Sequence, residues 1–203
     1  MKKTALFLPL LLTACSGLLP DLVGQPPALY ELRPPAEVAV SAPPSDRQLL
    51  IDVPVSSAGI DSPRIALMAA DHTLAYYKDV SWTDRAPVLF QSLLITAFDR
   101  SQKIPAVGRD NVGLRADYLL KTDLVDFQAD YTAQTPPTIK VAVTAKLIAM
   151  PRRIILAGKE FSAEVPAQTD DMGNVQLAFQ QASDAVLTQV VDWTLGQLAQ
   201  QKK

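Results

Sequence analysis

Few side chains in this chain are of types that could carry out chemistry, and the first is the thiol of Cys15, the single cysteine. A thiol can act as a nucleophile, bind a metal, form a disulfide or carry a lipid. His72 is the single histidine and follows Asp71 between two strand-like stretches. Catalysis or metal binding at His72 would need partner side chains that the composition does not supply. We expect His72 to be an exposed turn residue, and we expect no catalytic residue, no metal site and no cofactor.

Common motifs of catalysis and phosphate binding are also missing from the sequence. It contains no HExxH, CxxC, GxSxG or P-loop pattern, and its eight glycines form no phosphate-binding cluster. Carboxylates occur at Asp123, Asp126 and Asp130, and again at Asp170 and Asp171, where a solvated face explains them without an acid–base role. The 19 Lys and Arg residues are balanced by 21 Asp and Glu residues with no basic stripe, which argues against nucleic acid as a partner. We therefore interpret the protein as not being an enzyme.

The residues before Cys15 indicate export and lipid attachment. Lys2 and Lys3 precede a short apolar run over residues 4–12, the layout of a secretory signal peptide and too short to span a bilayer. The segment Leu12-Thr13-Ala14-Cys15 resembles the bacterial lipobox, in which cleavage falls between Ala14 and Cys15 and the cysteine receives a diacylglycerol and then an N-acyl chain such as palmitate. The alternative is an ordinary signal peptide with a chance cysteine. We predict a signal peptide over residues 1–14 and lipid attachment at Cys15.

The residue after the cysteine indicates the membrane to which the lipoprotein is sorted. An aspartate at this position favours retention at the inner membrane in diderm bacteria, whereas Ser16 resembles the pattern of lipoproteins sorted to the outer membrane. Several acyl chains make a stable anchor. We therefore expect a lipid-anchored protein on the periplasmic face of the outer membrane.

The sequence after the cysteine divides into a linker and a folded part. Residues 16–47 contain seven prolines, which exclude a continuous helix or a central strand. We predict a flexible linker over residues 15–29 and one domain over residues 30–203, with its compact core at about residues 48–201. A short strand at residues 30–32 would add to a sheet edge.

Periodicity predicts the elements of the folded part. The clearest strand is residues 138–150, where residues such as Val141 and Val143 alternate with polar ones such as Lys140. A helix begins after the capping residue Asp84, with Pro87 in its first turn. Further strands are expected at residues 48–53, 64–70, 73–78, 104–107, 117–132 and 153–165, and a long helix at 174–201. Short turns between consecutive strands predict a two-layer α+β fold: a largely antiparallel mixed sheet with two main helices on one face.

Aromatic residues supply the remaining candidates for a site. Tyr76, Tyr77 and Trp82 gather before the first helix, where they either pack in the core and at a sheet edge or contact a partner. Trp193 lies on the apolar stripe of the last helix, so we expect it to be largely buried.

The order of these features resembles that of a known family. The lipobox is followed by "YEL", then "LLIDVP", then the block "RIALMAADHTLAYYKDVSWTDRAPVLFQSLLITAF", then "YLLKTDLVDFQAD" and a final helix with Trp193. This pattern resembles the ABC-type transport auxiliary lipoprotein family. The resemblance implies a non-enzymatic subunit of a transporter that comprises an ATPase, a permease and a mammalian-cell-entry (MCE) domain protein and that moves phospholipids or other hydrophobic molecules across the cell envelope.

Three roles remain open at this point. The first is an outer-membrane adaptor that binds the MCE-domain protein and its permease–ATPase complex. The second is a periplasmic lipid-binding carrier, which would need an apolar pocket. The third is an assembly factor for an outer-membrane protein, and in each case a homo-oligomer is compatible with the sequence.

Overall fold

The computed structural model describes residues 25–110, 113 and 115–201. The predicted signal peptide and its cleavage site, Ala14 and Cys15, lie outside these described residues. Neither helix in the described part combines the length and hydropathy that crossing a bilayer requires.

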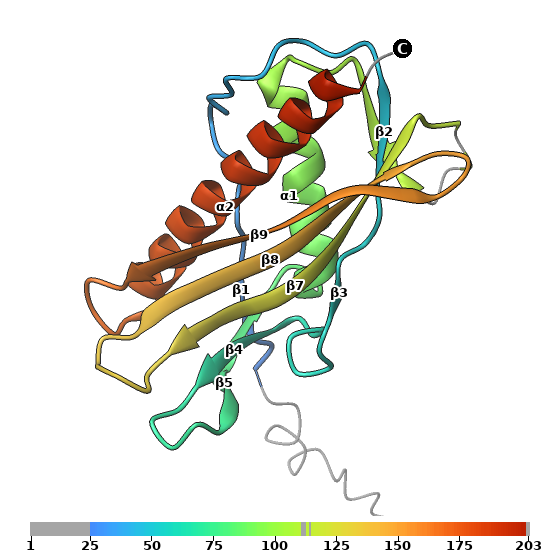
Figure 1. Ribbon diagram of the computed structural model, residues 1–203. Helices are drawn as coiled ribbons and strands as arrows, with labels where there is room; N and C mark the ends of the chain where they lie inside the picture. The colour runs from blue at the N-terminus through green and yellow to red at the C-terminus, as the bar shows by residue number, and fades with distance from the viewer. Residues whose placement is uncertain (1–24, 111–112, 114, 202–203) are drawn as a thin grey trace, which may run out of the picture.

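The described chain forms nine strands and two helices (Figure 1). In chain order they are β1 (Ala28–Tyr30), β2 (Gln48–Ile51), β3 (Val55–Ser56), β4 (Arg64–Met68), β5 (Leu74–Trp82), α1 (Ala86–Ser101), β6 (Ala106–Arg109), β7 (Tyr118–Asp130), β8 (Thr138–Ala149), β9 (Ile154–Pro166) and α2 (Met172–Gln200). Each predicted element is present, although β1 begins two residues earlier than the predicted strand and β6 two residues later.

Strand β7 organises the sheet. One of its edges pairs antiparallel with β8 along almost its whole length, and β8 pairs in the same way with β9. The other edge pairs in succession with β2, β3 and β4, each in parallel. The remaining pairings are antiparallel for β4–β5 and parallel for β1–β5 and β2–β6. The parallel pairings are short and the antiparallel ones long, so the predicted largely antiparallel mixed sheet is confirmed.

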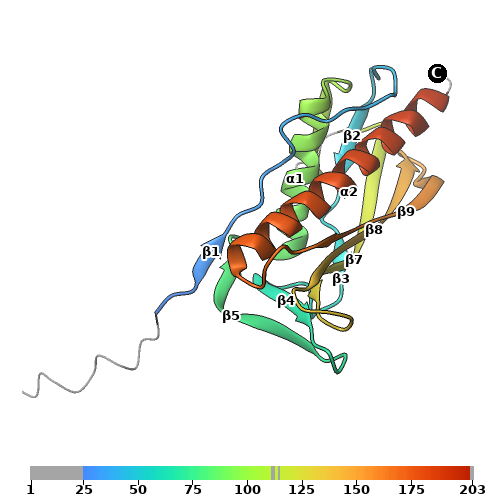
Figure 2. The ribbon, with the colours of Figure 1, turned by 90° about the vertical axis from the view of Figure 1, so that its left-hand side faces the viewer.

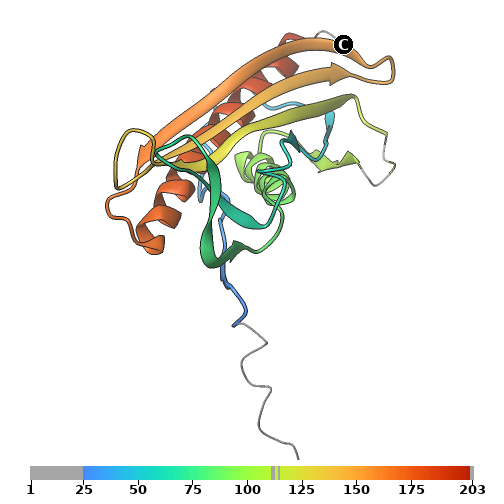
Figure 3. The same cartoon turned by 90° about the horizontal axis from the view of Figure 1, so that it is seen from below.

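Both helices cover the same face of the sheet, as predicted (Figure 3). Helix α1 begins with Arg85 at its N-cap, and no side chain caps it, whereas we had expected Asp84 in that role. The carboxylate of Asp84 instead accepts a hydrogen bond from the backbone N–H of Arg85. Pro87 lies in the first turn, where its missing N–H costs little. Helix α2 is capped by Asp171, whose side chain accepts from the N–H of Asn174.

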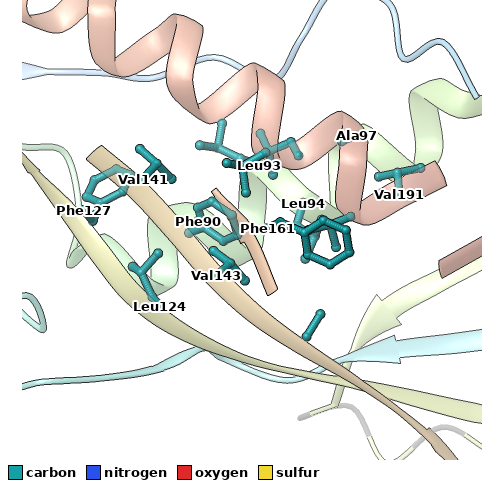
Figure 4. Close-up of a cluster of buried hydrophobic side chains, with 14 of the residues drawn as sticks. Phe90, Leu93, Leu94, Ala97, Leu124, Phe127, Val141, Val143, Phe161 and Val191 are labelled. Carbon is teal, nitrogen blue, oxygen red and sulfur yellow. The ribbon is translucent and has the colours of Figure 1, made fainter. Parts of the chain in front are cut away.

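The core lies between the helices and the inner face of β7, β8 and β9 (Figure 4). The predicted apolar stripes of both helices are buried, including Phe90 and Leu94 of α1 and Phe179 and Val186 of α2. On the sheet side they meet alternate residues of β7 and β8, such as Phe127. Trp193 is partly buried and packs against this core at its margin, so the expected burial is met only in part.

The proline-rich segment after β1 is extended but packed. It runs beside both helices before it enters β2 (Figure 2). Leu32, Val38 and Ala42 are buried in the main core, upstream of the core limits that we expected. The guanidinium of Arg100 donates hydrogen bonds of 2.6 Å to the carbonyl oxygens of Pro34 and Pro35. Prolines therefore remove this segment from the sheet, while its aliphatic side chains still join the domain.

Candidate functional site

The three aromatic residues proposed for partner contact do not form one cluster. Trp82, at the end of β5, is 1% exposed and belongs to the core. Its ring centroid lies 5.7 Å from that of Phe127 and 5.1 Å from that of Phe179. Trp82 is therefore a core residue, and its ring is not on a surface that a partner can reach.

Tyr77 belongs to a half-buried hydrogen-bond network at the end of the sheet. Its hydroxyl and that of Tyr131 are 2.8 Å apart, and the Tyr131 hydroxyl donates to the carboxylate of Asp170. Burial raises the pKa of Tyr77, and the hydrogen bond with Tyr131 adds to this effect. Burial and the hydrogen bond to Asp170 raise the pKa of Tyr131 to about 12. Both phenols therefore stay protonated and connect β5 to the loop before α2 as hydrogen-bonding groups.

Tyr76 belongs to a separate contact on the other side of β5. Its hydroxyl donates to the carbonyl oxygen of Gly59 at 3.0 Å, and the guanidinium carbon of Arg64 lies 3.5 Å from its ring centroid. A side chain at residue 59 would require Leu74 to move, because its Cβ would lie 2.3 Å from a methyl group of that leucine. Tyr76 and Tyr77 both remain partly exposed, so they remain candidates for partner contact.

His72 has the role expected from the sequence. It is exposed in the turn between β4 and β5, with a left-handed φ of 63°. Asp71 fixes this turn by accepting hydrogen bonds from the N–H and the hydroxyl of Thr73. These hydrogen bonds lower the pKa of Asp71.

The carboxylates on β7 lie apart along the strand, and two of them pair with lysines of β8. Asp123 lies 3.2 Å from Lys146, and Asp130 lies 2.6 Å from Lys140. Burial by itself would raise the pKa of Asp130, but hydrogen bonds from Lys140 and Thr132 outweigh it and lower the pKa to about 2. Burial raises the pKa of Asp126. Within the described residues, no group of three or more His, Cys, Asp or Glu side chains could hold a metal ion.

A groove of about 350 Å³ lies between β9 and the C-terminal half of α2. Its aromatic walls are Phe161 of β9 and Trp193 of α2, whose rings meet nearly edge to face with centroids 5.6 Å apart. Lys159, Asp192 and several glutamines of α2 make the rest of the lining polar. The sequence analysis identified Trp193 but not the groove, because pairing of Trp193 with Phe161 depends on how α2 crosses the sheet.

Apolar side chains also gather on the outer face of the sheet, at the end where β8 turns into β9. Leu50, Leu119, Ile148 and Ile155 form one cross-strand row over β2, β7, β8 and β9. The first three are buried, but Ile155 is 61% exposed. The sequence analysis missed this surface, although the run of two arginines and three aliphatic residues at 152–156 marks it.

Comparisons with known proteins agree with this architecture. A crystal structure of a protein from Xanthomonas campestris, assigned to the family DUF330, is 30% identical with a TM-score of 0.79, and the match covers 84% of this chain and 95% of that chain. A hypothetical protein from Chlamydia trachomatis is 9% identical with a TM-score of 0.53, covering 76% and 99% of the two chains. A PelC variant from Paraburkholderia phytofirmans, solved as a dodecamer, is 12% identical with a TM-score of 0.50, covering 80% and 96%. The last two show the fold alone.

The remaining comparisons concern sequence. No curated protein matches this chain. The model of the family described as ABC-type transport auxiliary lipoprotein component matches residues 30–191, which is most of the chain and spans β1 to most of α2. This protein therefore belongs to the ABC-type transport auxiliary lipoprotein component family.

Proposed function

We propose that this protein is a non-enzymatic accessory subunit of an MCE-type ABC transport system that moves phospholipids or other hydrophobic molecules across the cell envelope. It acts as an outer-membrane anchor and adaptor on the periplasmic side. The observation that carries the proposal is the family match over residues 30–191, joined to a lipobox that ends at Cys15. The hydrogen bonds and ion pairs of Asp123, Asp130 and Tyr131 support it, because they join elements of the fold.

In this proposal the protein acts by holding a folded domain close to its membrane. Acyl chains on Cys15 hold it to the membrane, and residues 16–27 separate that cysteine from β1. Fully extended, these twelve residues reach at most about 40 Å. A domain held this close to its membrane must meet a partner that itself crosses the periplasm, and the MCE-domain protein is the partner that we propose.

Two surfaces are proposed for this contact. Strand β9 pairs only with β8 among the described strands, so its other edge can accept a strand of a partner. The exposed parts of Tyr76 and Tyr77, which lie on opposite sides of β5, are the second candidate region, now without Trp82. The PelC structure of similar fold is a dodecamer, and we include a homo-oligomer of this chain among the arrangements to be tested.

A lipid carrier is the second role, and the groove between β9 and α2 is the place that it would use. Acyl chains bind in pockets lined mainly by apolar side chains. Phe161 and Trp193 meet this need, but Lys159, Asp192 and the glutamines do not. The groove therefore favours the adaptor over the carrier, and no contact in the described residues favours an assembly factor.

Crosslinking in intact envelopes tests the proposal. A photo-crosslinking residue is placed at Glu160, exposed on β9, or at Tyr76, with exposed Asp99 of α1 as the matched control. We expect the MCE-domain protein to be captured from at least one of the first two positions and not from residue 99. A chain that fractionates with the outer membrane but captures no MCE-domain protein from either position would contradict the adaptor role.

A further inference from the structure

The turn that joins β8 to β9 differs in composition from the rest of the surface. Residues 150–156, here called the hairpin tip, read Met-Pro-Arg-Arg-Ile-Ile-Leu. Arg152 and Arg153 are exposed. The three residues that follow are also exposed, at 51% for Ile154, 61% for Ile155 and 36% for Leu156. Contiguous exposed aliphatic residues are unusual on a soluble surface and mark sites of contact.

Strand register explains why this apolar surface extends around the hairpin. Ile155 lies opposite Ile148 on the outer face, while Ile154 lies opposite Ala149 and so points to the other face. The next pair along the hairpin is Leu147 with Ala157, so Leu156 has no partner on β8 and forms a bulge in β9. Both faces of the hairpin end are therefore apolar, and burying only one of them against a flat partner would leave the other exposed.

The hairpin tip is also locally basic in a chain of net charge −2. The carboxylate of Asp117 lies at the base of the turn and accepts a hydrogen bond of 2.8 Å from the N–H of Gln48. Its backbone carbonyl accepts from the N–H of Met150, which holds the turn against the sheet. Two arginines against this one carboxylate still give the exposed aliphatic residues a positive surrounding.

We propose that the hairpin tip inserts into the headgroup region of an anionic phospholipid surface. Peripheral membrane contacts commonly combine two kinds of side chain. Aliphatic side chains enter the interface, while arginines lay their apolar stems beside them and bind lipid phosphates with their guanidinium groups. Two arginines and three aliphatic residues make a weak contact on their own. The inference rests on the proposed lipid anchor, because an acylated cysteine keeps the tip at a high effective concentration near the membrane.

Geometry allows the anchor and the tip to meet one membrane. The hairpin tip lies at the end of the molecule away from β1 (Figure 1). Strand β8 has 12 residues and is about 40 Å long, taking about 3.3 Å per residue. Residues 16–27 reach at most about 40 Å when extended, so they can span that length. The domain would then lie along the membrane.

Hydrogen exchange of the acylated full-length mature protein tests this contact. The protein is placed in phosphatidylcholine vesicles, in phosphatidylcholine vesicles containing phosphatidylglycerol, and in uncharged detergent micelles. We expect amides of the hairpin tip to exchange more slowly in the anionic vesicles than in the other two. The turn at residues 69–73, between β4 and β5, serves as the internal reference and should exchange equally in all three.

Two variants separate charge from apolar insertion. Replacing Arg152→Gln and Arg153→Gln together should weaken the contact about twenty-five-fold, at about fivefold for each arginine, and remove the extra protection. Ile155→Ser should also reduce it, whereas Lys78→Gln, at a lysine whose side chain is 90% exposed on β5, should not.

The outcomes are distinct. Equal exchange of the tip in both kinds of vesicle, or unchanged protection in the arginine variant, would overturn the proposal. Protection that persists in detergent would also overturn it, because a protein surface or a second copy would then cover the tip. Flotation of the same samples in a density gradient checks the anchor. If the protein floats with neither kind of vesicle, the lipid anchor is contradicted, and with it the contact that depends on that anchor.

Discussion

The ring of Trp82 meets the ring of Phe179 edge to face, with centroids 5.1 Å apart and planes inclined by 82°. This contact joins the end of β5 to the N-terminal half of α2, two elements that are far apart in the sequence. Phe127 of β7 closes the group, at 5.7 Å from Trp82 and 5.4 Å from Phe179. The strands β1, β4 and β5, which form one end of the sheet, are thereby packed onto the main core.

Truncation of Trp82 should strongly destabilise the domain. Trp82→Ala should lower the free energy of unfolding by about 3–5 kcal/mol, because a large buried side chain leaves a cavity. Trp82→Phe should cost less, since it keeps an aromatic ring and removes an indole N–H that has no partner among the described residues. Chemical denaturation of both variants gives these values.

Trp193 provides the comparison for this measurement. It is partly buried at the edge of the groove, so Trp193→Ala should cost clearly less than Trp82→Ala. Equal losses for the two tryptophans would contradict the different burial described for them.

The proline-rich segment should contribute to stability as part of the domain. Leu32→Ala should cost about 2–5 kcal/mol, the usual cost for a buried leucine. Glu37→Ala, at an exposed position in the same segment, should leave the thermal midpoint nearly unchanged. If Leu32→Ala behaves like Glu37→Ala, this segment is a tether that does not contribute to the core.

The ion pair of Asp130 with Lys140 should make stability depend on acid pH. Hydrogen bonds lower the pKa of Asp130 to about 2, below the unfolded value of about 3.9. This stabilisation is therefore fully present above the unfolded value and is lost as the pH falls through about 2. Denaturation curves of Asp130→Asn and the unchanged protein should differ at about pH 7 and converge in acid.

Asp123→Asn is the matched control for this series. Its pair with Lys146 is more exposed, so the change should have a smaller effect on stability near neutral pH. An effect of Asp130→Asn that is the same at every pH would show that its contribution is not electrostatic.

Tyr131 should titrate late and couple to stability at alkaline pH. Its pKa is raised to about 12, above the ordinary value of about 10. The stabilisation that comes with the protonated phenol is thus present below about pH 10 and is lost as the pH rises through about 12. Absorbance titration should show one late phenol fewer in Tyr131→Phe than in the unchanged protein, because buried Tyr77 still titrates late. A normal titration of all tyrosines would contradict the network.

Local patterns of the sequence predicted the elements that bury one face. The alternation around Val141 in β8 and the stripe of α2 that includes Phe179 and Val186 each have a period that indicates which residues face the core. The two-layer fold follows, because both helices must bury their stripes on the same sheet. These features depend on neighbours in the sequence and could be inferred without a structure.

The features that the sequence analysis missed depend on contacts between distant residues. The parallel pairing of β2, β3 and β4 with one edge of β7 leaves no local pattern. Prolines before β2 indicate an extended chain but not the helices on which Leu32 packs. Trp193 shares the helical stripe with buried residues, yet it lies at the margin of the core beside Phe161.

Retargeting the protein tests most directly the claim that it works by position. The lipobox is replaced by a cleavable signal without a cysteine, at native expression, in cells that lack the original gene. We predict a soluble, folded periplasmic domain that still binds its partner but restores envelope integrity poorly. Full restoration by this untethered form would contradict the anchor and adaptor role.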